Sequence, residues 1–168
     1  NLADVAAEVH QLRARELQES GVTLSVTCAS RALVHAGFAD LTQVLLSLVI
    51  NAEQALSASR VEAPRITVRL LDAGLRVRCE VEDNGPGVRM EDEARLFQPF
   101  FTTRTVGEGT GLGLAISYGI VRSFDGTIGY FRNKTGGATF YFELPAMMTD
   151  EHGHDSTALL RRLDHTRI

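Results

Sequence analysis

Residues 107–114 read Gly-Glu-Gly-Thr-Gly-Leu-Gly-Leu and lead directly into a stretch with helical periodicity. Alternate glycines expose backbone N–H groups, and the start of a helix adds a partial positive charge, so the two together form a site for an anion or a phosphate. The stretch has neither the Gly-Lys-Ser/Thr of a Walker A sequence nor the glycine spacing of a dinucleotide-binding fingerprint. A flexible hinge is the alternative. Arg104, just upstream, is a candidate partner for a terminal phosphate, with a solvated loop arginine as its alternative.

A second glycine-containing stretch, Asp-Asn-Gly-Pro-Gly at residues 83–87, directly follows an apolar alternating run. Glycines let the backbone approach a flat ligand closely. A buried Asp83 needs a hydrogen-bond donor, and the exocyclic amine of adenine is one. Guanine presents a carbonyl oxygen at that place, so an acceptor here selects adenine. A tight turn is the alternative explanation for this stretch.

Two further groups of residues complete the pattern. Asn51 lies in a mostly apolar helical stretch, and its amide oxygen is a hard ligand of the kind that Mg²⁺ takes together with nucleotide phosphates. Backbone capping is its alternative role. Residues 136–139 read Gly-Gly-Ala-Thr, which is mostly turn chemistry; Thr139 faces a ligand only if the strand register allows it.

Hydrophobic periodicity around these stretches predicts the fold. Helices are expected after Asp4 as far as Gly21, after Asp40 as far as residue 55, and over residues 114–124. Alternation predicts strands at 22–28, 66–70, 75–81, 128–130 and 138–144, the last four as two hairpins. Residues 84–112 have no sustained periodicity, as in a functional or mobile loop. The expected architecture is one mixed sheet covered on one face by helices.

The composition sets limits on the class of protein. A length of 168 residues suits one compact domain, and 44% hydrophobic with 23% charged residues is ordinary for a globular chain. The net charge of −4 argues against nucleic acid or a membrane surface as a partner. Cys28 and Cys79 lie in apolar alternating runs and are expected to be buried thiols. The start at Asn1 suggests a piece of a longer cytosolic chain.

In this order, the four groups of residues resemble the catalytic, ATP-binding domain of two-component sensor histidine kinases, from the superfamily that includes gyrase and mismatch-repair ATPases. The matching stretches are residues 43–52, 83–87, 97–104, 109–114 and 136–139. The resemblance covers about residues 1–145 and leaves 146–168 as a polar tail. The Pro-Phe-Phe-Thr-Thr block at 99–103 is similar to kinases of the nitrogen-regulation and dicarboxylate-sensing subfamily.

The resemblance implies an α+β fold, a two-layer sandwich of a mixed, mostly antiparallel sheet and about three helices (the Bergerat-type ATP-binding fold). It implies ATP and Mg²⁺ as cofactors, with Asn51 on the metal, Asp83 on the adenine amine, Arg104 as the catalytic residue and residues 88–112 as a lid over ATP. The aromatic residues that would pack the lid or meet a partner helix are Phe97, Phe100 and Phe101. The implied cofactor-binding residues are Asn51, Ala55, Asp83, Gly85, Gly87, Val88, Thr103, Gly109, Thr110, Gly111, Leu112, Gly113, Leu114 and Thr139.

The implied function is transfer of the γ-phosphoryl group of ATP to a histidine on a separate dimerisation domain, for relay to a response regulator in the cytoplasm. None of the five histidines lies in the expected His-Glu/Asp-x-x-x-Pro context, so the acceptor domain is expected outside this chain. The parent is expected to be a homodimer and the isolated domain a monomer.

Three positions depart from the family pattern, one of them being Arg104, which stands where the subfamily often has a lysine and retains the charge. Ser47 stands where hydrolytic relatives have a glutamate general base, which argues against efficient hydrolysis of ATP. Gln54 stands where many relatives have a lysine. Ser47 and Gln54 leave a non-catalytic nucleotide-sensing or docking module as one alternative, and a serine kinase of the anti-sigma type is another.

Overall fold

The structure, a computed structural model, describes residues 1–103 and 110–147. Its helices are α1 (Leu2–Glu19), α2 (Phe38–Ala58), α3 (Met90–Glu93) and α4 (Gly113–Ser123). Its strands are β1 (Thr23–Cys28), β2 (Arg65–Ala73), β3 (Arg76–Asp83), β4 (Thr127–Arg132) and β5 (Ala138–Pro145). Each of the three long helices and both hairpins predicted from the sequence is present, and α3 is a short addition inside the stretch that lacked periodicity.

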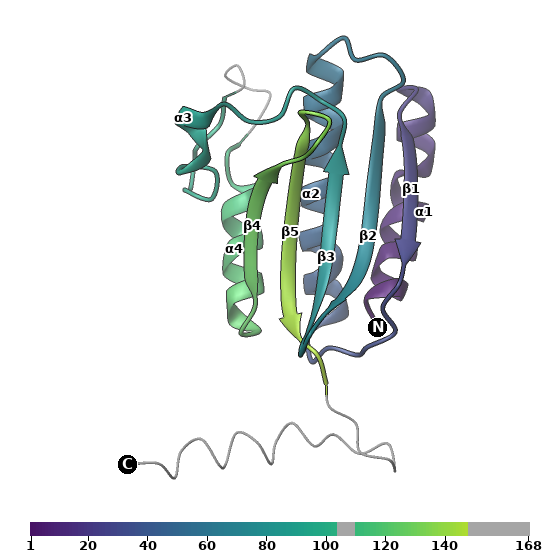
Figure 1. The fold of residues 1–168 in the computed structure, drawn as a ribbon, viewed down its shortest axis with the longest axis vertical. Helices are drawn as coiled ribbons and strands as arrows, with labels where there is room; N and C mark the ends of the chain where they lie inside the picture. Colours follow the sequence, from purple (N-terminus) through teal and green to yellow (C-terminus); the bar gives the residue numbers. More distant parts are fainter. Residues whose placement is uncertain (104–109, 148–168) are drawn as a thin grey trace.

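The five strands form one mixed sheet in the order β1-β2-β3-β5-β4. Only β1 and β2 pair in parallel, and the remaining pairs are antiparallel. The three long helices lie together on one face, behind the sheet in Figure 1, where α1 contacts β1, α2 contacts β3 and α4 contacts β4. The expected two-layer α+β sandwich is therefore confirmed.

Alternation along the central strands creates the apolar layer under the helices. Val68, Val81 and Phe140 stand opposite one another across β2, β3 and β5, and all three are buried. From the other side, α2 buries Leu45 and Leu48 against this layer. Each such side chain contributes about 1.5–3 kcal/mol when it is fully removed from water. This core holds the ends of β3 and β5 in a fixed relation to α2.

Two helix starts differ from the sequence prediction. Asn1 caps α1, because its side-chain Oδ1 accepts a hydrogen bond from the Ala3 N–H at 2.9 Å, while Asp4 lies inside the first turn. The N-cap of α2 is Gly37, and Asp40 is likewise one turn further in. Both aspartates lie in the first turn, where their negative charge interacts favourably with the positive end of the helix dipole. An aspartate in the first turn and an aspartate at the N-cap give similar sequence patterns.

The two cysteines differ in burial, contrary to the expectation of two core thiols. Cys79 is fully buried in the central strand β3, whereas Cys28 is exposed. The reason is that Cys28 is the last residue of β1, an edge strand with no neighbour on its outer side.

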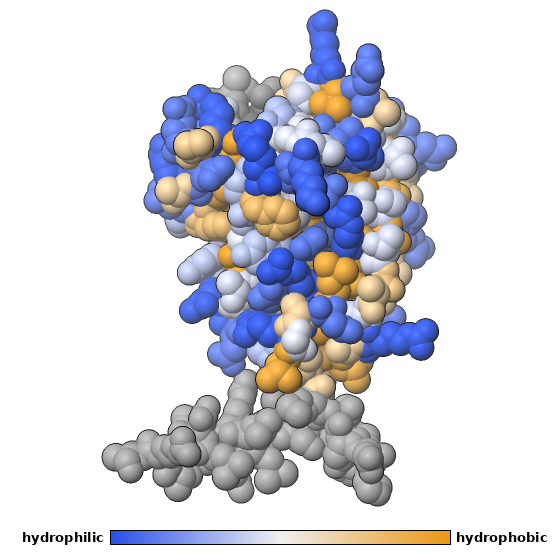
Figure 2. All heavy atoms as spheres, in the orientation of Figure 1, coloured by the Kyte–Doolittle hydropathy of each residue, from blue (hydrophilic) through white to orange (hydrophobic). Residues whose placement is uncertain are grey.

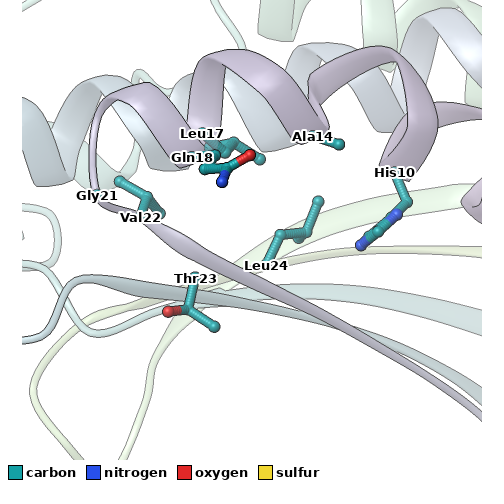
Figure 3. Close-up of a pocket in the computed structure, with 8 residues that line it drawn as sticks. All are labelled: His10, Ala14, Leu17, Gln18, Gly21, Val22, Thr23 and Leu24. Carbon is teal, nitrogen blue, oxygen red and sulfur yellow. The ribbon is translucent and has the colours of Figure 1, made fainter.

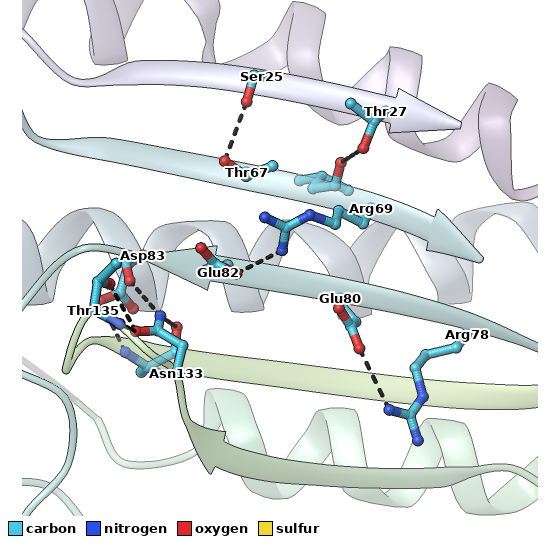
Figure 4. Close-up of polar contacts among 12 residues, drawn as sticks. Ser25, Thr27, Thr67, Arg69, Arg78, Glu80, Glu82, Asp83, Asn133 and Thr135 are labelled. Carbon is cyan, nitrogen blue, oxygen red and sulfur yellow. Dashed lines mark hydrogen bonds and ion pairs between the residues drawn. The ribbon is translucent and has the colours of Figure 1, made fainter. Parts of the chain in front are cut away.

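The face of the sheet that carries no helices is mostly hydrophilic (Figure 2). Cross-strand ion pairs join Arg69 to Glu82 at 2.5 Å and Arg78 to Glu143 at 2.6 Å, and Figure 4 shows the first of them together with the pair of Arg78 and Glu80. The pairing of opposite charges lets this face remain in water without a covering layer. Within the described residues, no helix combines the length and the apolar character that a membrane crossing needs.

Candidate functional site

Asp83, the last residue of β3, has a buried side chain whose carboxylate is held by backbone N–H groups. Its Oδ1 accepts hydrogen bonds from the Gly85 N–H at 2.8 Å and from the Ala138 N–H at 3.2 Å. Burial raises the pKa of this carboxyl, the charge of Glu82 adds to the rise, and the two N–H bonds oppose it. The described residues provide no hydrogen bond to the second oxygen, Oδ2. The carboxylate is thus fixed in orientation and retains one oxygen for an incoming donor.

Close backbone packing fixes the position of Asp83. A Cβ on Gly137 would collide with the Asp83 carbonyl oxygen, so only glycine fits at that point of the β4–β5 turn. The Nδ2 of Asn133 donates to the same Asp83 carbonyl at 2.8 Å and to the Ala138 carbonyl at 3.2 Å (Figure 4). The end of β3 and the β4–β5 turn therefore form one hydrogen-bonded unit.

Helix α2 passes beside this unit and reaches the start of α4. A Cβ on Gly85 would lie 3.6 Å from Leu56 Cδ2, which places the stretch after Asp83 against the C-terminal part of α2. The C-terminal part of α2 thus lies against Gly85. Further along, a Cβ on Gly113 would lie 2.8 Å from Ser47 Oγ, which places the first residue of α4 against α2. Asn51 and Ala55, both half-buried, lie on α2 between these two contacts.

The glycine-rich stretch has the expected helix start. Leu112 is the N-cap residue of α4 and Gly113 is its first residue, so the N–H groups of the first turn have no partner within the helix. Thr110 Oγ1 accepts a bond from the Leu112 N–H at 3.4 Å. Gly111 has a φ of +64°, and its carbonyl accepts a bond from the Phe100 N–H at 3.0 Å. This contact joins Phe100 to the glycine-rich stretch just before α4.

Aromatic contacts hold the segment that connects residues 83–87 to the glycine-rich stretch. The Phe97 ring lies 6.0 Å from the Tyr118 ring on α4 and 6.4 Å from the Phe140 ring on β5, measured between centroids. The Arg95 guanidinium lies 4.4 Å over the Phe101 ring. Phe100, by contrast, is exposed and has a φ of +65°. Two of the three phenylalanines are therefore half-buried against the domain, and the third points its ring toward solvent.

The described residues include most, but not all, of the predicted site. Asp83, Gly85 and Gly87 lie beside the β4–β5 turn, while Asn51 lies on α2 between the contacts that this helix makes with Gly85 and with α4. Thr103 is exposed. Arg104 and Gly109 lie outside the described residues.

The register of the sheet changes the place expected for Thr139. Thr139 pairs with Glu82, while Phe140 pairs with Val81. Thr139 therefore lies with Glu82 on the face of the sheet that carries no helices, and Asp83 lies on the opposite face. The neighbouring Ala138, through its backbone N–H, makes the contact with Asp83. We correct the prediction accordingly. The apolar alternation Ala-Phe-Phe-Leu at 138, 140, 142 and 144 contains the signal that could have shown this.

A shallow hollow of about 380 Å³ lies elsewhere, between α1 and β1. His10, Leu17, Thr23 and Leu24 are among the residues that line it (Figure 3). No residue of the predicted site lines it, and it has neither a fixed carboxylate nor a glycine-rich helix start. We therefore assign the functional site to the region around Asp83, α2 and α4.

A two-layer fold with a fixed carboxylate at the end of one strand and a glycine-rich helix start beside it defines a class of nucleotide-binding domains. The chain belongs to the family of histidine kinase-, DNA gyrase B-, and HSP90-like ATPases, whose sequence profile matches residues 38–148. Within that family, the chain is similar to sensor kinases. It is 33% identical over 170 residues to the sensor kinase CckA of Brucella abortus, an alignment that covers 93% of this chain and 18% of that protein.

Solved structures agree with this assignment. The catalytic domain of the histidine kinase ThkA matches with a TM-score of 0.75 and 33% identity over 86% of this chain and 92% of that one. A structure of ThkA in complex with the response regulator protein TrrA matches with a TM-score of 0.70 and 27% identity, over 86% of this chain and 40% of that one. The chain spans only 15–22% of the length of the first curated relatives that it matches.

Proposed function

We propose that this chain binds Mg-ATP and transfers the γ-phosphoryl group to a histidine on a separate domain, as the catalytic part of a sensor histidine kinase. The observation that carries the proposal is the geometry of Asp83, whose Oδ1 is held by the Gly85 and Ala138 N–H groups. A buried carboxylate of fixed orientation is an expensive feature, and a donor on the ligand compensates for its burial.

Asp83 selects the base. The exocyclic amine of adenine is the donor that its Oδ2 requires, and guanine offers an acceptor at the same place. Because Oδ1 is occupied by two backbone donors, the carboxylate cannot rotate to satisfy a different ligand. This arrangement supports adenine nucleotides over guanine nucleotides.

The donor set around α2 fits a magnesium ion that is held mainly by the nucleotide. No group of three His, Cys, Asp or Glu side chains suited to a metal occurs within the described residues. Asn51 offers one amide oxygen, and Mg²⁺ in nucleotide sites typically takes one or two protein oxygens together with phosphate oxygens and water. When bound, the ion neutralises phosphate charge. Asn51 holds it, and the first-turn N–H groups of α4 hold the phosphates.

Catalysis by this chain consists of positioning and neutralisation of charge. Arg104 binds the terminal phosphate in this proposal, and the backbone of residues 109–114 binds the phosphate chain. Residues 88–112 form the lid over ATP. Ser47 lacks the pKa of a general base, which disfavours hydrolysis of ATP by water relative to transfer. Residues 1–145 are the proposed ATP-binding domain.

The comparisons support a response regulator as one partner. ThkA has been solved in complex with the response regulator TrrA, which supports a receiver domain as the final phosphate acceptor for this chain as well. The histidine that receives the phosphoryl group first belongs to a two-helix dimerisation domain of the parent protein, and the proton of that histidine is removed by a group on the same domain.

A phosphotransfer assay tests the proposal. The chain is mixed with ATP radiolabelled at the γ-phosphate, Mg²⁺ and a histidine-bearing two-helix domain, and the labelled product is treated with acid or base. A label that is lost in acid and kept in base identifies phosphohistidine and supports the proposal. An acid-stable label identifies a serine kinase, and binding of ATP without label transfer identifies a docking module; either result contradicts it.

A further inference from the structure

The residues that lead from β3 into the proposed lid, 86–88, are held by a single arginine of β4. Arg132 donates from Nη2 to the Val88 carbonyl at 2.7 Å and from Nη1 to the Gly136 carbonyl at 2.8 Å. A longer contact runs from Nη1 to the Pro86 carbonyl at 3.4 Å. One guanidinium therefore connects the start of the lid with the β4–β5 turn. The chain leaves β3 at the end of the sheet where this turn lies (Figure 1).

A second side chain of β4 holds the other backbone group of Val88. The Val88 N–H donates to the Tyr130 hydroxyl at 3.3 Å. The Tyr130 ring is itself fixed by the Phe140 ring, 5.3 Å away between centroids. Both polar groups of the Val88 backbone are thus held by residues of one strand.

Gly87 makes room for the guanidinium. It has a φ of +71°, and a Cβ at this position would lie 2.6 Å from the Gly136 carbonyl oxygen and 3.0 Å from Arg132 Nη1. The side of Gly87 where a side chain would stand therefore faces Arg132 and the turn. Any larger residue would separate the lid from the arginine.

We propose that Arg132, supported by Tyr130, is a positioning residue that fixes the start of the lid relative to Asp83 and so keeps the nucleotide pocket formed before ATP arrives. The proposal rests on the proposed function. Preorganisation of this kind reduces the conformational entropy lost on binding, so a chain without it should bind ATP more weakly. Because Arg132 lies among backbone carbonyls and not beside the reacting phosphate, its loss leaves the rate of the bound complex unchanged.

Hydrogen exchange and kinetics of Arg132→Ala test this role. In the nucleotide-free chain, we expect amide exchange in residues 87–90 to become about tenfold faster, the effect of losing hydrogen bonds of about 1.4 kcal/mol in total. In the phosphotransfer assay, we expect KM for ATP to rise about five- to tenfold with kcat within twofold. Arg132→Lys keeps the charge but lacks the planar fork, so it should recover only part of the loss.

Arg122→Ala is the matched control, because Arg122 also donates to a backbone carbonyl, that of Gly126 at 3.3 Å, but at the far end of α4. Tyr130→Phe removes only the hydroxyl. Because Tyr130 and Arg132 both act on Val88, the double variant should change exchange by less than the sum of the single changes.

The following results would overturn the proposal: unchanged amide exchange of residues 87–90 in Arg132→Ala, an equal effect from Arg122→Ala, or a fall in kcat with KM unchanged. If the unmodified chain neither binds nor uses ATP, the proposed function fails, and the exchange experiment alone then decides whether Arg132 holds residues 86–88.

Discussion

The backbone N–H of Ala138 donates a hydrogen bond to Oδ1 of Asp83 at 3.2 Å, although the two residues lie 55 positions apart in the sequence. The bond joins the end of β3 to the beginning of β5, so two strands together determine the orientation of one carboxylate. A nucleotide pocket built in this way depends on the β4–β5 turn as much as on Asp83 itself.

The first prediction concerns the base. Asp83→Asn keeps an oxygen that can accept from Gly85 and Ala138, but it then directs an amide N–H group toward the adenine amine, donor against donor. We expect affinity for ATP to fall about tenfold to a hundredfold, since an unpaired buried donor costs about 1–3 kcal/mol. Isothermal titration calorimetry with ATP and GTP measures the effect. Asp72→Asn, an exposed position near the end of β2, is the control and should bind as before. Unchanged ATP affinity in Asp83→Asn would contradict the proposed role.

The second prediction concerns the pH dependence of stability. Burial raises the pKa of Asp83, so folding disfavours its charged form, and the penalty is present at pH values above the pKa of the folded state. At pH values below the ordinary aspartate pKa of about 3.9, the carboxyl is protonated in both states and the penalty disappears.

Asp83→Asn should therefore unfold at a higher temperature than the unmodified chain at pH 7, and this difference should decrease as the solution is acidified. Calorimetric scans of both proteins between about pH 3 and pH 7 measure this difference, because the carboxyl group titrates within that interval. A difference that grows toward acid would show that the sign is wrong.

The elements that carry the candidate site could be predicted from local sequence patterns. The alternation of β2 and β3 shows where the strand ends at Asp83, and the glycines directly after it and those before α4 mark the two turns. The parallel pairing of β1 with β2 is less accessible to such reasoning, because α2 separates the two strands and no turn marks their register.

The residues that sequence analysis missed act through backbone groups. Arg132 and Asn133 bind carbonyl oxygens of Val88 and Asp83, 44 and 50 positions away, and a carbonyl leaves no signature in the sequence. Cys28 was wrongly expected to be buried, because alternation cannot distinguish an edge strand from a central one.

The third prediction compares two glycines. A Cβ on Gly137 would collide with the Asp83 backbone, which cannot move away, so Gly137→Ala should cost about 1–3 kcal/mol of unfolding free energy and weaken nucleotide binding. Gly119, inside α4, has no atom within 4 Å of its Cβ position. Gly119→Ala should therefore stabilise the chain by about 0.5–1 kcal/mol. Urea unfolding of both variants decides; destabilisation of equal size at the two positions would argue against the described packing.

The fourth prediction concerns the thiols. Burial raises the pKa of Cys79 far above its ordinary value, and the thiol is inaccessible to solvent, while Cys28 is exposed. We expect one thiol equivalent to react with a chromogenic disulfide reagent at pH 8 in the native protein, and a second only after unfolding. In Cys28→Ser the fast equivalent should disappear. If Cys28→Ser kept a fast-reacting thiol, Cys79 would have to be accessible.

The last prediction separates the metal from the base. Asn51 and Asp83 lie on different elements, so the amide oxygen of Asn51 should contribute only when Mg²⁺ and phosphates are present. Asn51→Ala should lower the affinity for Mg-ATP about tenfold or more, the equivalent of one lost contact to a charged group of about 1.5 kcal/mol, and leave the affinity for adenosine unchanged.

Titrations with adenosine and with ATP, each with and without Mg²⁺, measure both effects. Gln43→Ala, an exposed change near the start of the same helix, is the matched control and should alter neither affinity. An equal loss for adenosine and Mg-ATP in Asn51→Ala would mean that the side chain supports the fold of the pocket, because a ligand without phosphates has no metal for Asn51 to hold.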